Sequence, residues 1–371
     1  MATDTPTASA VAEQAGPRLE SVVQVQKYER SIHIMAMLLV GFGFLMVFVK
    51  NYGRSAVTAT YLLVSVALPL YLLKDSRGFL GETHSDVDRL ILAEFAAASL
   101  LICAGAVLGR LKMAQYIVLA LLFVPCYAFN EWIVLDKGLG LVSSFADTGG
   151  SIVIHAFGAF FGLGVLMTMT TRQEFDKPVE SDATSDRFSL LGSMVLWLFW
   201  PSFCAALVTP EKVPATIVNV VLALCGATLA TYLASVRLRG KISAADIANA
   251  TLAGGVAIGS TCDFATNTSA FTIGVLAGAL STFGFAVIQS KLQGLVKGID
   301  TCGVMYLHGL PGLLGGLAAL FVVDGIARGP QLIGIAVTIA IALIAGFAAG
   351  KVLAIFGRRT EPYLDKEEFA D

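Results

Sequence analysis

The chain has 371 residues, of which 56% are hydrophobic and only 14% are charged. So few charges exclude a soluble globular domain of this size. The formal net charge of −2 provides no basic field for nucleic acid, and we expect no nucleic-acid partner. The six Cys lie in or beside apolar runs without a C-x-x-C pair, which predicts small buried residues rather than a disulfide or zinc framework.

Apolar stretches long enough to cross a bilayer follow one another along the chain. About eleven are expected, at 31–49, 56–73, 89–109, 113–135, 150–170, 188–208, 214–236, 245–262, 272–290, 300–323 and 331–356. Gly, Ala and Ser are scattered through them, as close helix packing in lipid requires. The sequence therefore predicts an all-α, multi-pass protein of the cell membrane, plasma or inner.

The expected helices form two sets of five and a final helix, and an odd set inverts the second repeat relative to the first. The predicted parts are a flexible polar tail (1–30), a single transmembrane channel domain (31–356) and a short cytoplasmic tail (357–371). The channel domain comprises repeat one (31–170), a mixed-charge linker (171–187), repeat two (188–323) and a final helix (331–356). Lys and Arg are more numerous in the alternate loops that include the linker, which predicts an outer N-terminus and an inner C-terminus.

One pattern occurs twice, at the start of the fifth and of the tenth expected helix. The pattern is Asp-Thr-x-Gly, followed by a His eight positions after the Asp and by a Gly seven positions after the His. The first copy consists of Asp147, Gly150, His155 and Gly162, and the second of Asp300, Gly303, His308 and Gly315. In a helix, such a His lies roughly 12 Å deeper than its Asp, near the middle of a hydrocarbon core about 30 Å thick. Two imidazoles matched in depth predict a transporter or channel with its site at the midplane.

Other interpretations of these residues remain open at this point. The two His could be buried side chains that bond only to backbone, although their matched positions argue against it. A metal site would need a third ligand at this depth, and Glu94 lies near the end of its helix, so we expect no metal and no cofactor. Asp147 and Asp300 are expected mainly to cap their helices, and also to shape the field for an arriving cation.

The chain resembles, over nearly its whole length, the Rh (Rhesus) branch of the ammonium transporter/Rh superfamily. The motifs that carry the resemblance are Val40-Gly41-Phe42-Gly43-Phe44-Leu45-Met46, Tyr52-Gly53-x-Ser55-Ala56-Val57, Glu94-Phe95, Gly105-Ala106-Val107-Leu108-Gly109, Asn130-Glu131, Asp147 to Gly162, Trp200-Pro201-Ser202-Phe203 and Asp300 to Gly316. Two departures stand out. Cys204 occupies a position where the family usually has Asn, and the segment between Glu131 and Asp147 is longer than expected.

The resemblance implies a homotrimeric ammonia channel in the lipid bilayer, with one pore in each subunit and no enzymatic activity. It assigns Phe95 and Phe203 to an outer gate, and His155 and His308 to the pore lining and proton shuttle. Glu131 would be a vestibule carboxylate that concentrates cations or, equally, a solvated carboxylate at the interface. Leu207 stands where ammonium transporters place a cation-holding Ser, which favours the Rh branch over a high-affinity transporter.

We therefore expect the protein to recruit ammonium at the outer mouth, to deprotonate it there and to conduct neutral ammonia past the His pair. A bare ion in such a pore would cost several kcal/mol, whereas ammonia needs only a few hydrogen bonds. Methylammonium is a further candidate substrate. The alternatives are a channel for carbon dioxide or another small neutral gas, and a membrane receptor that senses ammonium.

Overall fold

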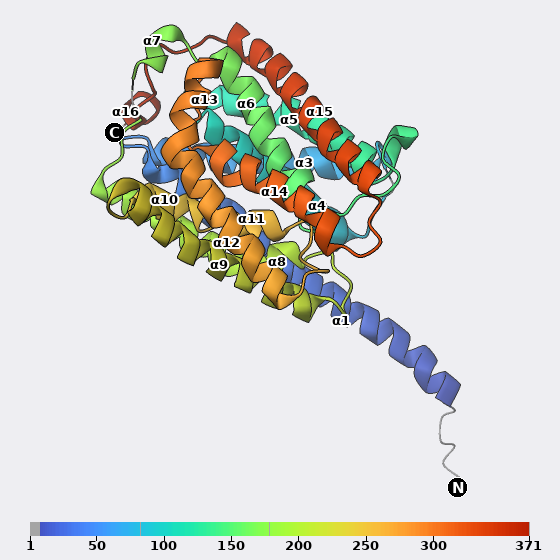
Figure 1. Ribbon diagram of the computed structural model, residues 1–371. Coiled ribbons are helices and arrows are strands. Elements are labelled where there is room, and N and C mark those ends of the chain that lie inside the picture. Colours follow the sequence, from blue (N-terminus) through green and yellow to red (C-terminus); the bar gives the residue numbers. More distant parts are fainter. Residues whose placement is uncertain (1–7, 82, 178, 371) are drawn as a thin grey trace.

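The computed structural model describes residues 8–81, 83–177 and 179–370, and within these ranges the regular elements are helices without a strand. They pack into one bundle, from which the start of α1 (Ala8–Ala36) projects (Figure 1). The prediction of an all-α protein is confirmed. Residues 8–30 of the expected tail belong to α1, and residues 1–7 lie outside the described residues.

The first half of the chain carries the elements up to the linker. They are α1, η1 (Met37–Phe42), α2 (Gly43–Leu45), η2 (Met46–Phe48), α3 (Gly53–Ser76), α4 (Asp86–Ala106), α5 (Met113–Val134), η3 (Gly138–Gly140), η4 (Ser151–Ala156), α6 (Phe157–Met169) and α7 (Arg172–Phe175). The start of α4 illustrates how the sequence sets a boundary. The Ser85 hydroxyl accepts a hydrogen bond from the Asp88 amide, and two acidic residues in the first turn favour the positive end of the helix.

The second half carries the remaining elements. They are α8 (Ala183–Cys204), α9 (Val213–Arg239), α10 (Ala244–Ala250), α11 (Ala253–Ile258), α12 (Asn267–Phe283), η5 (Gly284–Ile288), α13 (Gln289–Val296), η6 (Met305–Gly309), α14 (Leu310–Val322), α15 (Arg328–Ile355) and α16 (Asp365–Glu368). Consecutive elements such as α12, η5 and α13 continue one another along a single rod (Figure 1).

Nine helices of the described chain are long and apolar enough to cross a membrane, which makes this a multi-pass membrane protein. They coincide with nine of the expected spans, while α8 occupies the place of the sixth. The eighth is not one continuous helix, because α10 and α11 divide it. A Cβ on Gly255, in α11, would lie 2.5 Å from the Trp200 ring, so this broken segment depends on glycine for its close packing. The total of eleven spans stays a prediction.

Glycines let helices approach backbone to backbone, both within the second half and between the two halves. A Cβ on Gly274 of α12 would lie 2.0 Å from the carbonyl oxygen of Ala223 in α9. A Cβ on Gly346 of α15 would lie 2.2 Å from the carbonyl oxygen of Phe161 in α6. Helix association in lipid relies on such close van der Waals packing, since burial of apolar surface gives little gain there.

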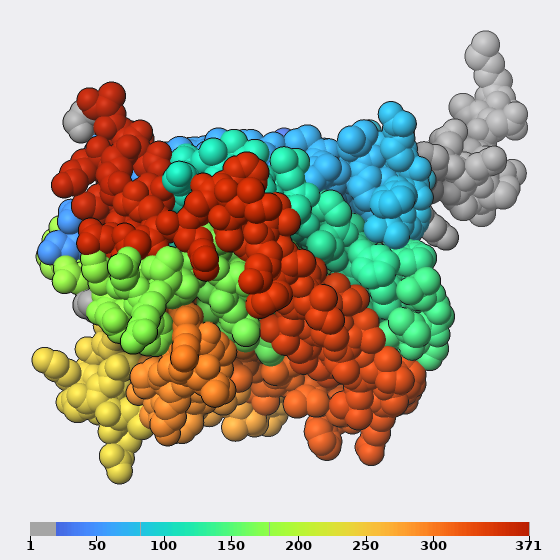
Figure 2. Space-filling view, turned by 90° about the horizontal axis from the view of Figure 1, so that it is seen from above, coloured from blue at the N-terminus to red at the C-terminus, as the bar shows by residue number. Residues whose placement is uncertain are grey.

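The C-terminal segment lies against the linker (red and light green in Figure 2). The Thr171 hydroxyl donates to the Arg359 carbonyl at 2.8 Å, and the Tyr363 amide donates to the Gly109 carbonyl at 2.9 Å. We call this the inner end of the bundle and the opposite end the outer end, following the predicted orientation. The domain boundaries and the orientation itself stay predictions.

Candidate functional site

The structure brings the two predicted His side chains together in the middle of the bundle. His155 lies in η4 and His308 in η6, each a single π-helical turn that leads into α6 or α14. Their Nδ1 atoms are 3.2 Å apart, and their rings lie 5.3 Å apart at 13°, nearly parallel. Both side chains are almost completely buried. Single π turns occur often at functional sites, where they re-aim a side chain.

The Asp-Thr-x-Gly motif builds the start of each His helix. Gly150 and Gly303 have φ of +75° and +68°, a left-handed conformation that glycine adopts without strain. The turn lets the Asp147 carboxylate accept from the amides of Ile152 and Val153, at 3.1 and 2.7 Å. In the second copy the corresponding carboxylate accepts from the amides of Val304 and Met305 at 2.9 and 3.0 Å.

Both motif carboxyl groups are buried helix caps, and neither lies at an open mouth. The Asp147 carboxylate also accepts from the Ser260 hydroxyl at 2.5 Å, so its oxygens are engaged by protein. Burial raises the pKa of Asp147 to about 7 and that of Asp300 to about 6, against the opposing effect of these hydrogen bonds. The contacts fit the expected capping role and leave little room for direct contact with a substrate.

The glycine that lies seven residues after each His permits close contact between helices on its side of the site. A Cβ on Gly162 would lie 2.8 Å from the Cβ of Ala106, in α4. A Cβ on Gly315 would lie 2.3 Å from the Ala257 carbonyl oxygen and 2.6 Å from Ser151 Oγ. The repeated glycine is therefore needed for close packing of α6 and α14 against their neighbours, and this packing positions the two imidazoles.

Aromatic rings cover the His pair toward the outer end. Phe95 of α4 and Phe203 of α8 have ring centroids 4.7 Å apart at 50°, so they are tilted rather than stacked in parallel. The Phe203 ring lies 6.0 Å from that of His155, and Trp200 stacks on the same imidazole at 5.5 Å. Both Phe side chains are buried. The sequence interpretation gave no role to Trp200, although its place in the Trp-Pro-Ser-Phe motif was a usable signal.

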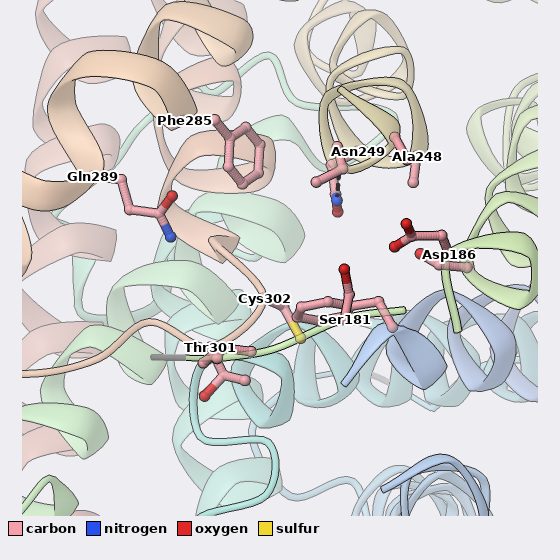
Figure 3. Close-up of a pocket in the computed structure, with 13 residues that line it drawn as sticks. Ser181, Asp186, Ala248, Asn249, Phe285, Gln289, Thr301 and Cys302 are labelled. Atoms are coloured by element: carbon pink, nitrogen blue, oxygen red, sulfur yellow. Dashed lines mark hydrogen bonds between the residues drawn. The ribbon is translucent and has the colours of Figure 1, made fainter. Parts of the chain in front are cut away.

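A narrow, mainly apolar pocket of about 20 Å³, which we call the apolar passage, lies next to His308 on its inner side. Phe42, Leu101 and Val304 line it, and the Phe42 ring lies 6.3 Å from that of His308. The passage shares its inner residues with a vestibule of about 220 Å³, namely Phe48, Asn249 and Cys302. Figure 3 shows the polar side chains that line this vestibule, Ser181, Asp186, Asn249, Gln289 and Thr301. Sequence reasoning missed these residues, which come together only in the fold.

Glu131 lies apart from the passage, in a buried cluster between α3 and α5. Its side chain is only 6% exposed, which does not fit a solvated carboxylate at the interface. The Tyr71 hydroxyl donates to it through a short hydrogen bond, and Tyr127 is a second hydrogen-bonding neighbour. These hydroxyls supply the partners that a buried carboxylate requires. The structure therefore does not bring Glu131 into contact with the Phe pair.

A pair of aromatic rings, a pair of hydrogen-bonded imidazoles, the apolar passage and the vestibule thus follow one another, and each shares a ring contact or a lining residue with the next. Such a series suits the passage of a small uncharged molecule that can donate and accept a hydrogen bond midway. It does not suit a bare cation, because walls that are mainly apolar cannot replace the water that the ion would lose.

The Ammonium Transporter Family model matches residues 20–368. The chain is 37% identical to "Ammonium transporter Rh type B" of Pan troglodytes, over 91% of this chain and 79% of that protein. It is 38% identical to "Ammonium transporter Rh type A" of Canis lupus familiaris, over 78% of this chain and 70% of that protein.

Solved structures agree with these matches. Nitrosomonas europaea Rh50, described as one of the Rhesus protein family of channels, superposes with a TM-score of 0.92 at 56% identity, over 94% of this chain and 93% of that one. A protein described as "Sensor Amt Protein" superposes with a TM-score of 0.78 at 18% identity, over 94% of this chain and 96% of that one, which shows the shared fold alone. The chain therefore belongs to the Rh branch of the ammonium transporter family.

Proposed function

We propose that this protein is an ammonia channel that passes neutral ammonia between His155 and His308, after ammonium has lost its proton on the outer side. The family supports the ammonia channel, and the geometry of the His pair supports this route. The observation that carries the proposal is the 3.2 Å contact between the two Nδ1 atoms, deep in the bundle and next to the apolar passage that His308 lines.

The contact supports one way in which the two rings can share protons. One Nδ1 must carry hydrogen and the other must accept it, since two N–H groups could not face each other at this distance. In the neutral pair the accepting ring then has N–H at Nε2, and the donating ring has a bare Nε2. The Nε2 of His155 has no partner within the described protein. One ring thus offers a donor and the other an acceptor, which suits ammonia because ammonia can do both.

The surroundings disfavour the transfer of charge. The walls next to the pair are apolar, and a cation between them would lose its hydration without replacement ligands. An ammonium ion would therefore release its proton before it reached the imidazoles. We infer that Phe95 and Phe203 form a gate that must part briefly, since both rings are buried and close over the pair.

We further propose that the protein forms a homotrimer with one passage in each subunit, with the N-terminus outside and the C-terminus inside. The function is transport, and the proposal includes no chemical conversion beyond proton transfer. Carbon dioxide would need no hydrogen-bonding imidazole, so loss of a His should reduce ammonia flux more than carbon dioxide flux.

The test is stopped-flow alkalinisation of proteoliposomes that contain a pH dye. Wild type should alkalinise rapidly after an ammonium gradient is applied, and His155→Ala and His308→Ala should each change the rate substantially. His84→Ala is the matched control, because His84 pairs with Asp75 away from the passage and its loss should leave the rate unchanged. Wild-type rates in both central His variants would overturn the assigned route.

A further inference from the structure

Two cysteines meet beside the outer gate. Cys204 is the last residue of α8 and directly follows Phe203, while Cys262 lies in the loop between α11 and α12. Both side chains are almost fully buried, at 2% and 0% exposed, and both are free thiols. The spacing of the cysteines in the sequence gave no reason to pair them, so this contact is a product of the fold.

The backbone around Gly149 and Gly259 holds the two sulfurs in one small space. Cys204 Sγ lies 3.0 Å from the position that a Cβ on Gly149 would take, and the Gly259 carbonyl oxygen lies 3.1 Å from that position. Cys262 Sγ in turn donates to the same carbonyl at 3.5 Å. Both sulfurs therefore lie against the same stretch of backbone, where Gly149 meets Gly259. A side chain on Gly149 would fill this space, which the glycine leaves to the sulfurs.

We propose that Cys204 and Cys262 are a redox-active pair, which a peroxide converts to a disulfide that slows conduction. The sulfur of one thiol attacks an oxygen of hydrogen peroxide and becomes a sulfenic acid, while the thiol proton passes to the departing hydroxide, which leaves as the first water. The second sulfur then attacks the sulfenic sulfur, the S–S bond forms, and the second water leaves. Two thiols are oxidised, one peroxide is reduced, and the two thiol protons end in the two waters.

The location of the two cysteines gives hydrogen peroxide access to them. By the predicted orientation the pair lies at the outer end, which faces the more oxidising side of a cell membrane. Hydrogen peroxide is small, uncharged and hydrogen-bonding, as ammonia is, so the same mouth can admit it.

A disulfide would join the end of α8 to the segment that supports the first His helix. In that segment the Gly149 amide donates to the Gly259 carbonyl at 2.7 Å, and Ser260 donates to Asp147. The Phe203 ring, one residue from the bond, would then lose freedom to swing away from Phe95. The effect on flux rests on the proposed function, whereas bond formation does not.

The experiment measures both quantities on the full chain in proteoliposomes treated with hydrogen peroxide. Peptide mass spectrometry should find a disulfide between Cys204 and Cys262, and ammonia flux should fall several-fold and recover with a reductant. Cys204→Asn and Cys262→Ser should keep their flux in peroxide. Cys225→Ser is the matched control, since Cys225 lies on α9 in a different part of the fold, and it should respond as wild type does.

The two parts can fail separately. Absence of the disulfide after peroxide treatment would overturn the pairing, whatever happens to flux. A complete disulfide with unchanged flux would overturn its effect on conduction. If untreated wild type carried no ammonia flux at all, the proposed function would fall, while the mass spectrum would still decide the redox chemistry.

Discussion

Replacing Gly315 by Ala should destabilise the channel, although alanine is the better helix former. A Cβ at this position would lie 2.3 Å from the Ala257 carbonyl oxygen and 2.6 Å from Ser151 Oγ. Neither atom can move away easily. The Ala257 carbonyl is part of the backbone of helix α11. The Ser151 hydroxyl is held by two hydrogen bonds, since it donates to the Val256 carbonyl at 2.6 Å and accepts from the Ser260 amide at 2.8 Å. Relief therefore requires α14 and α11 to separate by about 1 Å, to ordinary van der Waals contact.

The balance of magnitudes favours destabilisation. Overpacking of this kind costs about 1–3 kcal/mol, and more where backbone atoms clash, against a gain in helix propensity of about 1 kcal/mol. Because the clash is with a backbone carbonyl, we take the upper part of this range, about 2–3 kcal/mol, and expect a net loss of about 1–2 kcal/mol and a melting temperature in detergent that is lower by a few degrees. Because Ser151 begins the π turn that carries His155, ammonia flux should fall as well.

Gly294→Ala is the matched control. This glycine lies inside helix α13, and a Cβ there would meet no atom within 4 Å. The control variant should gain the higher helix propensity of alanine without a steric clash, so its melting temperature should rise slightly. If Gly315→Ala melted at or above the wild-type temperature, the packing requirement inferred from the repeated glycine would be refuted.

Three further outcomes are expected. Burial raises the pKa of Asp300 in the folded chain to about 6, above an ordinary value of about 3.9, so folding takes up a proton between these pH values. Stability should therefore fall as pH rises from about 4 to about 6, and denaturant unfolding of Asp300→Asn should show a shallower slope there, to which Asp147 still contributes, a difference on the order of 2–3 kcal/mol. Phe95→Leu should raise the ratio of methylammonium to ammonia flux in stopped-flow assays, because the mouth loses one ring of a pair 4.7 Å apart. Asp365→Ala should cost about 1 kcal/mol in thermal unfolding, since this carboxylate accepts from the Ser55 amide at 2.8 Å and caps α3 from the far end of the chain, whereas an unchanged stability would refute that role.

Sequence reasoning reached the central features because each depends on local chemistry or on the repeat. Long apolar runs predict helices in lipid without any knowledge of partners. The repeated Asp-Thr-x-Gly and its His marked two equivalent helix starts, and inversion of the repeat predicted that the helices would meet. The 3.2 Å contact between His155 and His308 is consistent with that prediction.

The features that were missed depend on contacts between distant segments. No local pattern distinguishes the π turns from ordinary helix, and none marks the break between α10 and α11 at Thr251 and Leu252. Glu131 could not be read as buried, because its tyrosine partners come from other positions on α3 and α5. Likewise, Cys204 and Cys262 meet only after α8 and the loop behind α11 have folded together.

The number of charges that cross with each ammonia molecule tests the central claim most directly. Currents would be recorded from wild-type proteoliposomes on a supported membrane, in parallel with dye-reported alkalinisation under the same ammonium gradient. The account predicts rapid alkalinisation without a sustained current, and no change in rate when the membrane potential is reversed. A sustained current that follows ammonium concentration and scales with the flux would show that charge crosses too, and would contradict the passage of neutral ammonia between the two imidazoles.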